Sequence, residues 1–367
     1  MKSNAASNTT PQSDLKLVDL DYPFSENCIA TIPAQPRDSA RMMVVRRNSQ
    51  DIVHARVSDL PRWLQAGDQV VLNETKVAPA RVVLKRQHDG HDFEGLLAEK
   101  RTDGTWLLMA KNSRKFREQD RLCLQHESGA PGAHLICLSK VPDGWIVAFA
   151  DGTDSQAALE ECGRTPLPPY IVRARGDSGP SEAFDRTHYR TTFGHDSRYH
   201  SVASPTAGLH FTPELLRQVE AATQCAPTFV TLEVGMGTFK AIETPRLADH
   251  VMHCERFSVS AATLARLDAT RPNGRLVVVG TTTVRALESL PSPLPNCDFH
   301  GESSLFIQPG YQFKHVDALL TNFHLPRSTL LSLVGSLVGL DRLKSLYALA
   351  QQMNYRFYSY GDAMLIL

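Results

Sequence analysis

The sequence contains no pair of cysteines in the C-x-x-C spacing, although seven cysteines are spread over its 367 residues. An odd number of cysteines at irregular spacing argues against a disulfide framework, a zinc ribbon and an iron–sulfur site. We therefore expect free thiols in a reducing compartment, the cytoplasm.

Long apolar runs and an excess of one charge are also missing. Residues 1–14 are polar and lack the apolar centre of a signal peptide, so we expect a disordered tail there. The longest apolar run, Leu330–Leu340, is too short to span a bilayer, and we expect no membrane contact. The 39 basic and 39 acidic side chains cancel, so any site for RNA must be a local patch.

What remains is the composition of a globular protein long enough for two domains, with 42% hydrophobic residues. Between Asp68 and Asp151, short apolar runs alternate with three Asp-Gly turns, which is typical of antiparallel hairpins. About six such strands would form a small barrel or sandwich. We predict a mixed-sheet α/β domain, residues 15–67 and 152–367, interrupted by an inserted antiparallel β-barrel domain, residues 68–151.

The stretch SVASPTAGLHFTPELL, residues 201–216, is a small-residue loop that runs into a helix. Thr212 can cap this helix and Pro213 can occupy its first turn. The loop would present Thr206 and His210 beside helix-terminal N–H groups, which attract anions. An ordinary helix entrance with an incidental histidine is the alternative.

Two later segments repeat a strand, a polar turn and a helix. Arg275–Leu290 has the turn Gly-Thr-Thr-Thr, which suits a carboxylate, ribose or phosphate, although capping alone explains one threonine. Asp317–Leu337 has Asn322 and His324 in its turn. The chain closes with a predicted strand, Ala363–Leu367. Strand ends in an open α/β sheet meet at one edge, where ligands bind.

Two further motifs are weaker. TFVTLEVGMGTF predicts a buried strand leading to Gly235 and Gly237, but the third glycine of a dinucleotide fingerprint is absent and the pair is also compatible with a bulge. His250 and His253 lie three residues apart without a third well-spaced ligand, so we expect no metal there. Hydrogen bonding, acid–base work or simple packing would explain these histidines.

These blocks resemble the S-adenosylmethionine:tRNA ribosyltransferase-isomerase family of queuosine biosynthesis over most of residues 17–367. The blocks that carry the resemblance are RDSAR, PLPPYI, SVASPTAGLHFT, VTLEVGMGTF, HVMHCE, VVVGTTTVRALES, FIQPGYQF, VDALLTNFHLPRSTLL and YRFYSYGDAMLI. The resemblance implies transfer and isomerisation of the ribosyl part of S-adenosylmethionine onto 7-aminomethyl-7-deazaguanine at the tRNA wobble position. The products would be epoxyqueuosine-tRNA, adenine and methionine.

S-adenosylmethionine would be a co-substrate, and this chemistry requires no prosthetic group and no metal. We expect a cytoplasmic monomer that binds tRNA. The reaction needs a base for the proton on the 5′ carbon beside the sulfonium, an acid for the departing adenine, and dry surroundings. The candidates for proton transfer are His210, His253, His324 and Asp362.

Other side chains would hold the substrates. Arg285 with the threonine turn would bind the methionine carboxylate, and aromatic faces would lie against the sulfonium. The substrate-binding candidates are Thr206, Gly208, Phe211, Gly235, Gly237, Thr281, Thr282, Arg285, Asn322, Phe323 and Tyr360. Basic side chains are candidates for RNA contact, with an ordinary solvated surface as the alternative. They are Arg37, Arg41, Lys111, Arg114, Lys115, Arg117 and Arg190.

The chain departs from the family pattern at several positions. Glu233 stands where the family block has histidine, Met236 where it has alanine, and residues 240–242 replace Gln-Pro-Val. A carboxylate in place of an imidazole changes charge and proton-transfer capacity. A second interpretation is therefore that the chain is a relative of this family that modifies another amine acceptor. A third is a non-catalytic RNA-binding relative, although the retained polar loops count against it. The glycine-rich loop of an ordinary methyltransferase is not evident.

Overall fold

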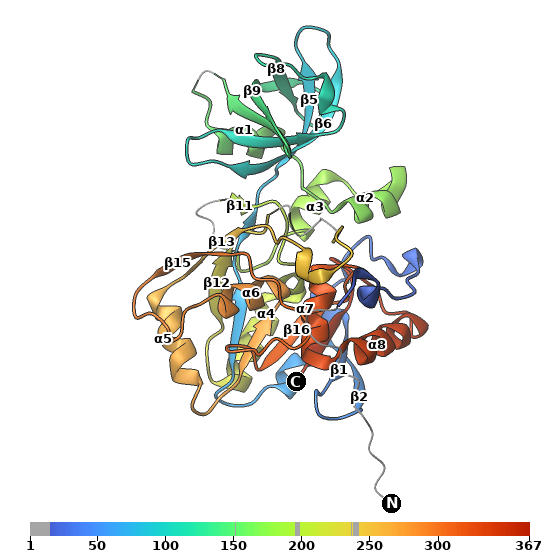
Figure 1. Ribbon diagram of the computed structural model, residues 1–367, viewed down its shortest axis with the longest axis vertical. Coiled ribbons are helices and arrows are strands. Elements are labelled where there is room, and N and C mark those ends of the chain that lie inside the picture. The colour runs from blue at the N-terminus through green and yellow to red at the C-terminus, as the bar shows by residue number, and fades with distance from the viewer. Residues whose placement is uncertain (1–14, 151, 195–198, 236, 238–241) are drawn as a thin grey trace, which may run out of the picture.

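The computed structural model describes residues 15–150, 152–194, 199–235, 237 and 242–367. A nine-stranded mixed sheet covered by helices lies below a closed six-stranded antiparallel barrel, as Figure 1 shows. The predicted fold class is confirmed. The tail predicted at residues 1–14 and the departures at Met236, Lys240 and Ala241 fall outside the described residues.

The large sheet has the strand order β15-β13-β12-β3-β14-β16-β17-β1-β2. Its strands are β1 (Arg41–Val45), β2 (Ile52–Arg56), β3 (Gln69–Asn73), β12 (Thr228–Leu232), β13 (Glu255–Val259), β14 (Leu276–Val279), β15 (Phe299–Ser303), β16 (Ala318–Asn322) and β17 (Ala363–Ile366). Strands β12, β3, β14 and β16 are parallel, and β17 runs antiparallel to β16 with Ala363 opposite Asn322. The ends of four strands and the start of β17 therefore meet at one edge.

Alternate residues of the central strands face two separate hydrophobic cores, because successive side chains of a strand point to opposite faces. On β14, Leu276 and Val278 belong to one core, and Val277 and Val279 belong to the other. The first face is covered by helices α5 (Ala261–Thr270), α6 (Thr281–Glu288), α7 (Thr329–Val338) and α8 (Leu340–Gln352). Helix α4 (Pro213–Thr223) covers the second face.

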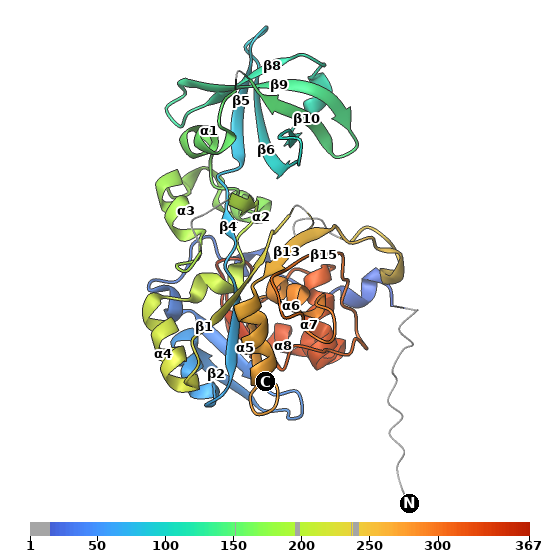
Figure 2. The same cartoon turned by 90° about the vertical axis from the view of Figure 1, so that its left-hand side faces the viewer.

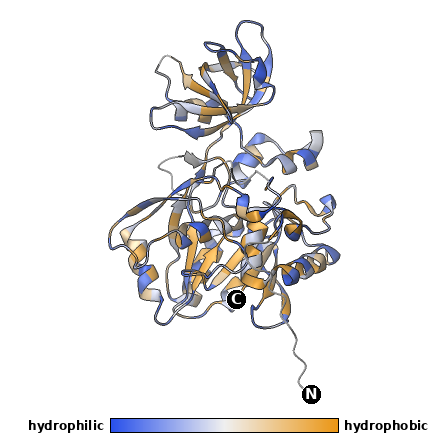
Figure 3. Cartoon of the chain, in the orientation of Figure 1, coloured by the Kyte–Doolittle hydropathy of each residue, from blue (hydrophilic) through white to orange (hydrophobic). Residues whose placement is uncertain are grey.

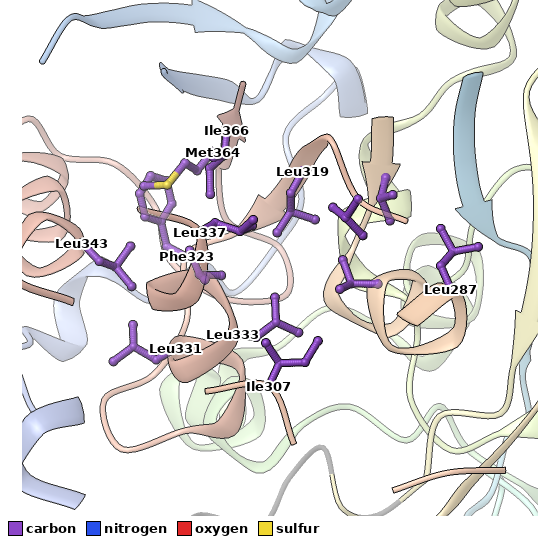
Figure 4. Packing of buried hydrophobic residues seen from close by; sticks show 14 of the residues in the cluster. Leu287, Ile307, Leu319, Phe323, Leu331, Leu333, Leu337, Leu343, Met364 and Ile366 are labelled. Carbon is purple, nitrogen blue, oxygen red and sulfur yellow. The ribbon is translucent and has the colours of Figure 1, made fainter. Parts of the chain in front are cut away.

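Figure 4 shows part of the first core, where Phe323 lies among leucines of α7 and near Met364 of β17. The strands of both sheets are the most apolar parts of the ribbon in Figure 3, and polar residues dominate the outer helix faces and turns. The central strands β3, β14, β16 and β17 are buried on both faces, and most of their residues are apolar, without the alternation of polar and apolar residues seen in a strand with one exposed face.

The barrel contains β5 (Arg81–Arg86), β6 (Asp92–Lys100), β7 (Trp106–Ala110), β8 (Arg121–Gln125), β9 (Pro131–Val141) and β10 (Gly144–Phe149). Its interior is a hydrophobic core of its own, which includes Leu84, Leu108 and Leu135. Helix α1 (Ser155–Cys162) packs onto this core through Leu159 and Cys162.

One strand of the segment predicted to form the barrel belongs to the large sheet instead. The run at Gln69–Asn73 was expected within the barrel segment, but β3 is a central strand of the large sheet and the barrel begins at Arg81. All five residues of β3 are buried, and such a run has the same apolar pattern in a barrel as in a covered sheet. The division into two domains stays a prediction.

The chain passes between sheet and barrel through two neighbouring segments (Figure 2). Strand β4 (Lys76–Val77) pairs with β11 (Tyr199–Ser201), and Arg81 forms a bridge with Arg164. The returning segment carries α2 (Pro169–Arg175) and α3 (Glu182–His188). Pro169 begins α2, because proline fits the first helical turn. None of the helices in the described ranges is long and apolar enough to cross a membrane.

Candidate active site

The loop at Thr206–His210 lies over the end of β16, where it forms a buried hydrogen-bond cluster with Asn322. The Thr206 hydroxyl donates to Asn322 Oδ1 over 3.2 Å, and the Asn322 amide donates to the Tyr358 carbonyl over 3.1 Å. Asn322 Nδ2 is also 3.4 Å from His210 Nε2. Three residues singled out from the sequence, Thr206, His210 and Asn322, are therefore brought together.

The same contacts determine the tautomer of His210. The Asn322 amide nitrogen must face the Tyr358 carbonyl, so it also donates toward His210 Nε2, which accepts. The proton of the neutral imidazole is then on Nδ1. Burial lowers the pKa of His210 to about 4, although the negative charge of Asp362 opposes this shift. The ring is neutral at neutral pH and both of its nitrogens are engaged, because the backbone of Arg37 is also within hydrogen-bond reach.

His324 is the second buried imidazole at this edge. Its Nε2 is 2.9 Å from the Thr321 hydroxyl, and its backbone N–H donates to the Tyr347 hydroxyl over 3.1 Å. Burial lowers the pKa of His324 to about 3, so this ring is also neutral at neutral pH. Unlike His210, it lines a cavity.

That cavity has a volume of about 90 Å³ and lies between the loop at residues 203–207, the start of α6 and the end of β16. Its polar lining includes Ser204, Thr206, Thr281, Thr282, Asn322 and His324, together with Tyr170, Tyr189, Thr321, Tyr358 and Ser359. Within the described chain, the Ser204 Oγ and the Tyr358 hydroxyl are buried without a hydrogen-bond partner. Such atoms are costly to bury unless a ligand or water satisfies them.

The start of α6 opens toward the cavity through Gly280, Thr281 and Thr282. Gly280 adopts φ +87° and ψ 147°, a conformation that only glycine enters without strain. Thr283 is fully buried and donates to the Val279 carbonyl over 2.6 Å, so it continues the helix and does not face a ligand.

Sequence reasoning missed Asn73, which ends β3 beside this turn. Its side chain exchanges two 3.1 Å hydrogen bonds with the backbone of Leu232, and its amide lies 3.4 Å from the Thr282 hydroxyl. Asn73 thereby fixes the ends of β3 and β12 and the first turn of α6 relative to one another. The signal that could have found it is a polar residue closing an apolar run, QVVLN. Ser204 was missed because it lies among small residues that predict only a tight loop.

A groove of about 740 Å³ lies between the barrel and the sheet. On the sheet side it is lined by Glu233, Gly235, Gly237, His253 and Glu255, and on the barrel side by residues that include Lys100, Arg101 and Trp106. Residues that are adjacent in the chain line the groove and the cavity. Val202 and Gly235 line the groove, and their neighbours Ala203 and Val234 line the cavity.

Some of the predicted residues line the groove rather than the cavity. His253 lies in the groove, and a Cβ at Gly237 would be 2.7 Å from the His253 Cβ, so close packing explains this glycine. Glu233 also lines the groove and pairs with Arg256 over 3.0 Å. No cluster of three metal-binding side chains among the described residues includes His250 or His253.

Arg285, predicted to bind the methionine carboxylate, pairs with a carboxylate of the protein itself. Its guanidinium is buried, forms an ion pair with Glu255, and donates to the carbonyls of Ser303 and Leu305 over 3.1 and 3.2 Å. The other Glu255 oxygen accepts from the Gly235 N–H over 2.9 Å. Arg285 therefore supports the glycine turn, and its donors do not face the cavity.

Asp362 is likewise tied to the protein. Its two oxygens accept from the backbone N–H groups of Arg41 and Arg356 over 3.0 and 2.8 Å, and the side chain is 2% exposed. Among the aromatic candidates, only Phe323 touches the cavity. Phe211 and Tyr360 lie in hydrophobic clusters. Gly208 is closely packed, since a Cβ there would lie 3.0 Å from the Phe193 ring.

The basic candidates fall into two groups. Arg37 donates to the carbonyls of Thr187 and Arg190, and Arg41 donates to the Met353 carbonyl, so both hold the chain together. The remaining candidates, Lys111, Arg114, Lys115, Arg117 and Arg190, lie at the surface. Lys111 pairs with Glu94 over 2.9 Å.

Comparison with known proteins identifies a family for this chain. The model of the family described as queuosine biosynthesis protein matches residues 17–366. An S-adenosylmethionine:tRNA ribosyltransferase-isomerase of Sphingopyxis alaskensis is 42% identical over 95% of each chain. One of Ruegeria pomeroyi is 40% identical, covering 96% of this chain and 99% of that protein. The crystal structure of an S-adenosylmethionine tRNA ribosyltransferase from Thermotoga maritima is 33% identical, with a TM-score of 0.52 over 95% of this chain and 100% of that one.

Proposed function

Because the chain belongs to the queuosine biosynthesis protein family, we propose that it transfers and isomerises the ribosyl part of S-adenosylmethionine onto 7-aminomethyl-7-deazaguanine in tRNA. The wobble nucleoside becomes epoxyqueuosine, and adenine and methionine leave. The names of full-length relatives at about 40% identity support the reaction class. The substrate nucleoside is our extension of those names.

The observation that carries the proposal is the buried polar cavity at the strand edge, with the neutral imidazole of His324 in its wall. A neutral ring retains a lone pair that can accept a proton. Ser204 Oγ and the Tyr358 hydroxyl supply polar groups with no partner among the described residues. We assign proton transfer to His324 rather than to His210, whose two ring nitrogens are engaged.

His210 and Asn322 then act as positioning residues for the cavity wall. The first-turn N–H groups and hydroxyls of Thr281 and Thr282 are suited to an anionic or ribose group of the co-substrate, because free N–H groups at a helix start attract such ligands. Arg285 contributes indirectly, through Glu255 and the Gly235 turn.

We place the tRNA nucleoside at the groove between sheet and barrel. The groove adjoins the cavity, and its volume of about 740 Å³ is ample for a nucleotide. Basic residues at the surface of the barrel turn, Lys111, Arg114, Lys115 and Arg117, would contact the RNA backbone. We further propose a cytoplasmic monomer, and the seven free cysteines fit a reducing compartment.

The test is a nucleoside digest of tRNA carrying 7-aminomethyl-7-deazaguanine, after incubation with the purified protein and S-adenosylmethionine. Epoxyqueuosine and adenine in equal amounts would support the proposal. Adenine without modified tRNA would instead favour a relative with another amine acceptor, for which Glu233 in the groove is the motivating residue. Tight tRNA binding with neither product would identify a non-catalytic RNA-binding relative.

A further inference from the structure

Three side chains with metal-binding atoms lie close together on the barrel. None of them lines the cavity or the groove. They are His126 at the end of β8 and the neighbours Glu161 and Cys162 at the end of α1. Their ligand atoms all lie within 4.8 Å of one another. His126 Nε2 is 3.7 Å from Cys162 Sγ and 3.7 Å from Glu161 Oε1.

These separations are close to those imposed by a shared zinc ion. With Zn–S near 2.3 Å and Zn–N and Zn–O near 2.0 Å, a tetrahedral site separates sulfur from nitrogen by about 3.5 Å and nitrogen from oxygen by about 3.3 Å. Both observed separations lie within a few tenths of an ångström of these values. The nitrogen–oxygen separation is too long for a direct hydrogen bond.

The backbone holds the ligand-bearing segments in place. His126 begins a tight turn, in which its N–H donates to the Ala130 carbonyl over 2.9 Å and its carbonyl accepts from the Gly129 N–H over 2.9 Å. Helix α1 ends with the Gly163 N–H donating to the Leu159 carbonyl over 2.9 Å. The metal would therefore meet ligands that are already arranged, which lowers the ordering cost of binding.

Gly132 of β9 leaves room beside these ligands. A Cβ built on Gly132 would lie 2.3 Å from Cys162 Sγ and 3.2 Å from His126 Nε2. Any larger residue would thus occupy the space in which the sulfur and the imidazole approach each other.

We propose that His126, Glu161 and Cys162 bind a zinc ion, with water as the fourth ligand. A thiolate, an imidazole and a carboxylate form a donor set that suits zinc. Cys162 is 1% exposed, whereas the Glu161 side chain is 69% exposed and leaves a path from solvent. On binding, zinc replaces the thiol proton, which passes to solvent, and no atom is oxidised or reduced. The ion would tie the end of α1 to the turn between β8 and β9.

The experiment uses the full-length protein after treatment with a chelator. Cobalt(II) is titrated while thiolate-to-cobalt charge transfer is followed by absorbance, and zinc is then added to displace it. We expect one equivalent of cobalt per chain, displacement by zinc, and a higher Tm with zinc. Cys162→Ser and His126→Ala should lose the band. Cys297→Ser and His88→Ala should keep it, since both change exposed residues outside the cluster.

Glu161→Gln is the variant least able to disturb folding, because the side chain is mostly exposed, and it should weaken cobalt binding measurably. Circular dichroism and Tm of the metal-free variants check that they are folded. Absence of a charge-transfer band in the parent protein, or an unchanged band in folded Cys162→Ser, would overturn the proposal. The cluster would then be a thiol–imidazole hydrogen bond alone. Neither result depends on the proposed tRNA chemistry.

Discussion

Thr206 and Asn322, which are 116 residues apart in the chain, share a hydrogen bond of 3.2 Å at the edge of the large sheet. The Asn322 amide also contacts His210 of the same loop and donates to the Tyr358 carbonyl. One amide side chain therefore joins three segments that surround the cavity.

Replacing Asn322 by alanine should impair both stability and turnover. The Thr206 hydroxyl and the Tyr358 carbonyl would lose a buried partner, which costs about 1–3 kcal/mol in the free energy of unfolding. Adenine release at saturating substrate should fall as the cavity wall loosens. Urea unfolding and an adenine-release assay measure the two effects. Asn48→Ala, outside the cavity, is the control, and equal losses in both variants would contradict our view of Asn322.

The buried histidines predict the acid sensitivity of the fold. Burial lowers the pKa of His324 from 6.5 to about 3, so the native state stays unprotonated where the unfolded chain already binds a proton. The native state therefore loses stability as the pH falls from about 7 toward 3, and the loss from this residue reaches about 2 kcal/mol at pH 5. His210, with a pKa of about 4, adds a loss of the same sign.

His324→Gln should remove its share of that pH dependence. Urea unfolding at pH 7 and pH 5 gives the loss for the parent and for the variant, and we expect the variant's loss to be smaller by about 2 kcal/mol. The exposed His88 provides the comparison as His88→Gln. Identical losses in parent and His324→Gln would show that the imidazole is not buried neutral. Turnover should also be lost if His324 transfers a proton.

Gly280 and Gly104 offer a matched pair for separating strain from function. Both have similar positive φ angles, +87° and +85°, but Gly280 begins α6 beside the cavity and Gly104 lies in a barrel turn with open space around it. Alanine at either position should cost about 1–3 kcal/mol of stability through backbone strain. Only Gly280→Ala should raise the KM for S-adenosylmethionine. A similar KM change in Gly104→Ala would attribute the effect to stability alone.

The basic residues at the surface of the barrel turn should affect tRNA binding and not the co-substrate. Changing Arg114, Lys115 and Arg117 together to glutamine should raise the KM for tRNA and leave the KM for S-adenosylmethionine unchanged. The slope of log affinity against log salt should fall by about 0.7–0.9 for each phosphate that the protein no longer neutralises. Arg46→Gln with Arg62→Gln, two changes outside the barrel, is the control. An unchanged slope would place the RNA elsewhere.

Glu233 tests whether the departure from the family alters the acceptor. Because its ion pair with Arg256 is partly exposed, Glu233→His should change stability by less than about 1 kcal/mol. We expect epoxyqueuosine to form in both proteins, with the KM for tRNA as the quantity that changes. Mass spectrometry of digested tRNA measures this. Epoxyqueuosine made only by the histidine variant would indicate that the natural chain serves another acceptor.

Local sequence patterns predicted the strands and helices that carry the site. The contacts of the site residues could not be predicted in the same way, because many of them join distant parts of the chain. The strand and helix around Gly280 follow from five apolar residues, a glycine turn and an amphipathic run, all within Arg275–Leu290. Nothing local indicates that Arg285 of helix α6 pairs with Glu255, because that partner lies 30 residues away on strand β13. The hydrogen bond of Asp362 to Arg41 is hidden for the same reason, since 321 residues separate the two. The backbone donors to Asp362 come from Arg41 and Arg356.

The barrel illustrates a second limit. Asp-Gly turns and short apolar runs predict its six strands. The same pattern also assigned β3 to the barrel, because the sequence of a strand buried on both faces does not indicate to which sheet the strand belongs. The proposed zinc ligands are unpredictable from spacing, because His126 and Cys162 meet only once α1 has packed against the barrel.

Arg81 and Arg164 exchange hydrogen bonds of 3.1 and 2.7 Å, so the segment between them starts and finishes at a single paired position. In genetic terms, the barrel is encoded as one insertion, between Arg81 and Arg164, into the sequence of the α/β part. A short glycine-containing turn could join these two residues without changing the register of β3, β12 or β14. A single insertion or deletion between these two residues would therefore add, remove or exchange the barrel, and with it the barrel side of the groove.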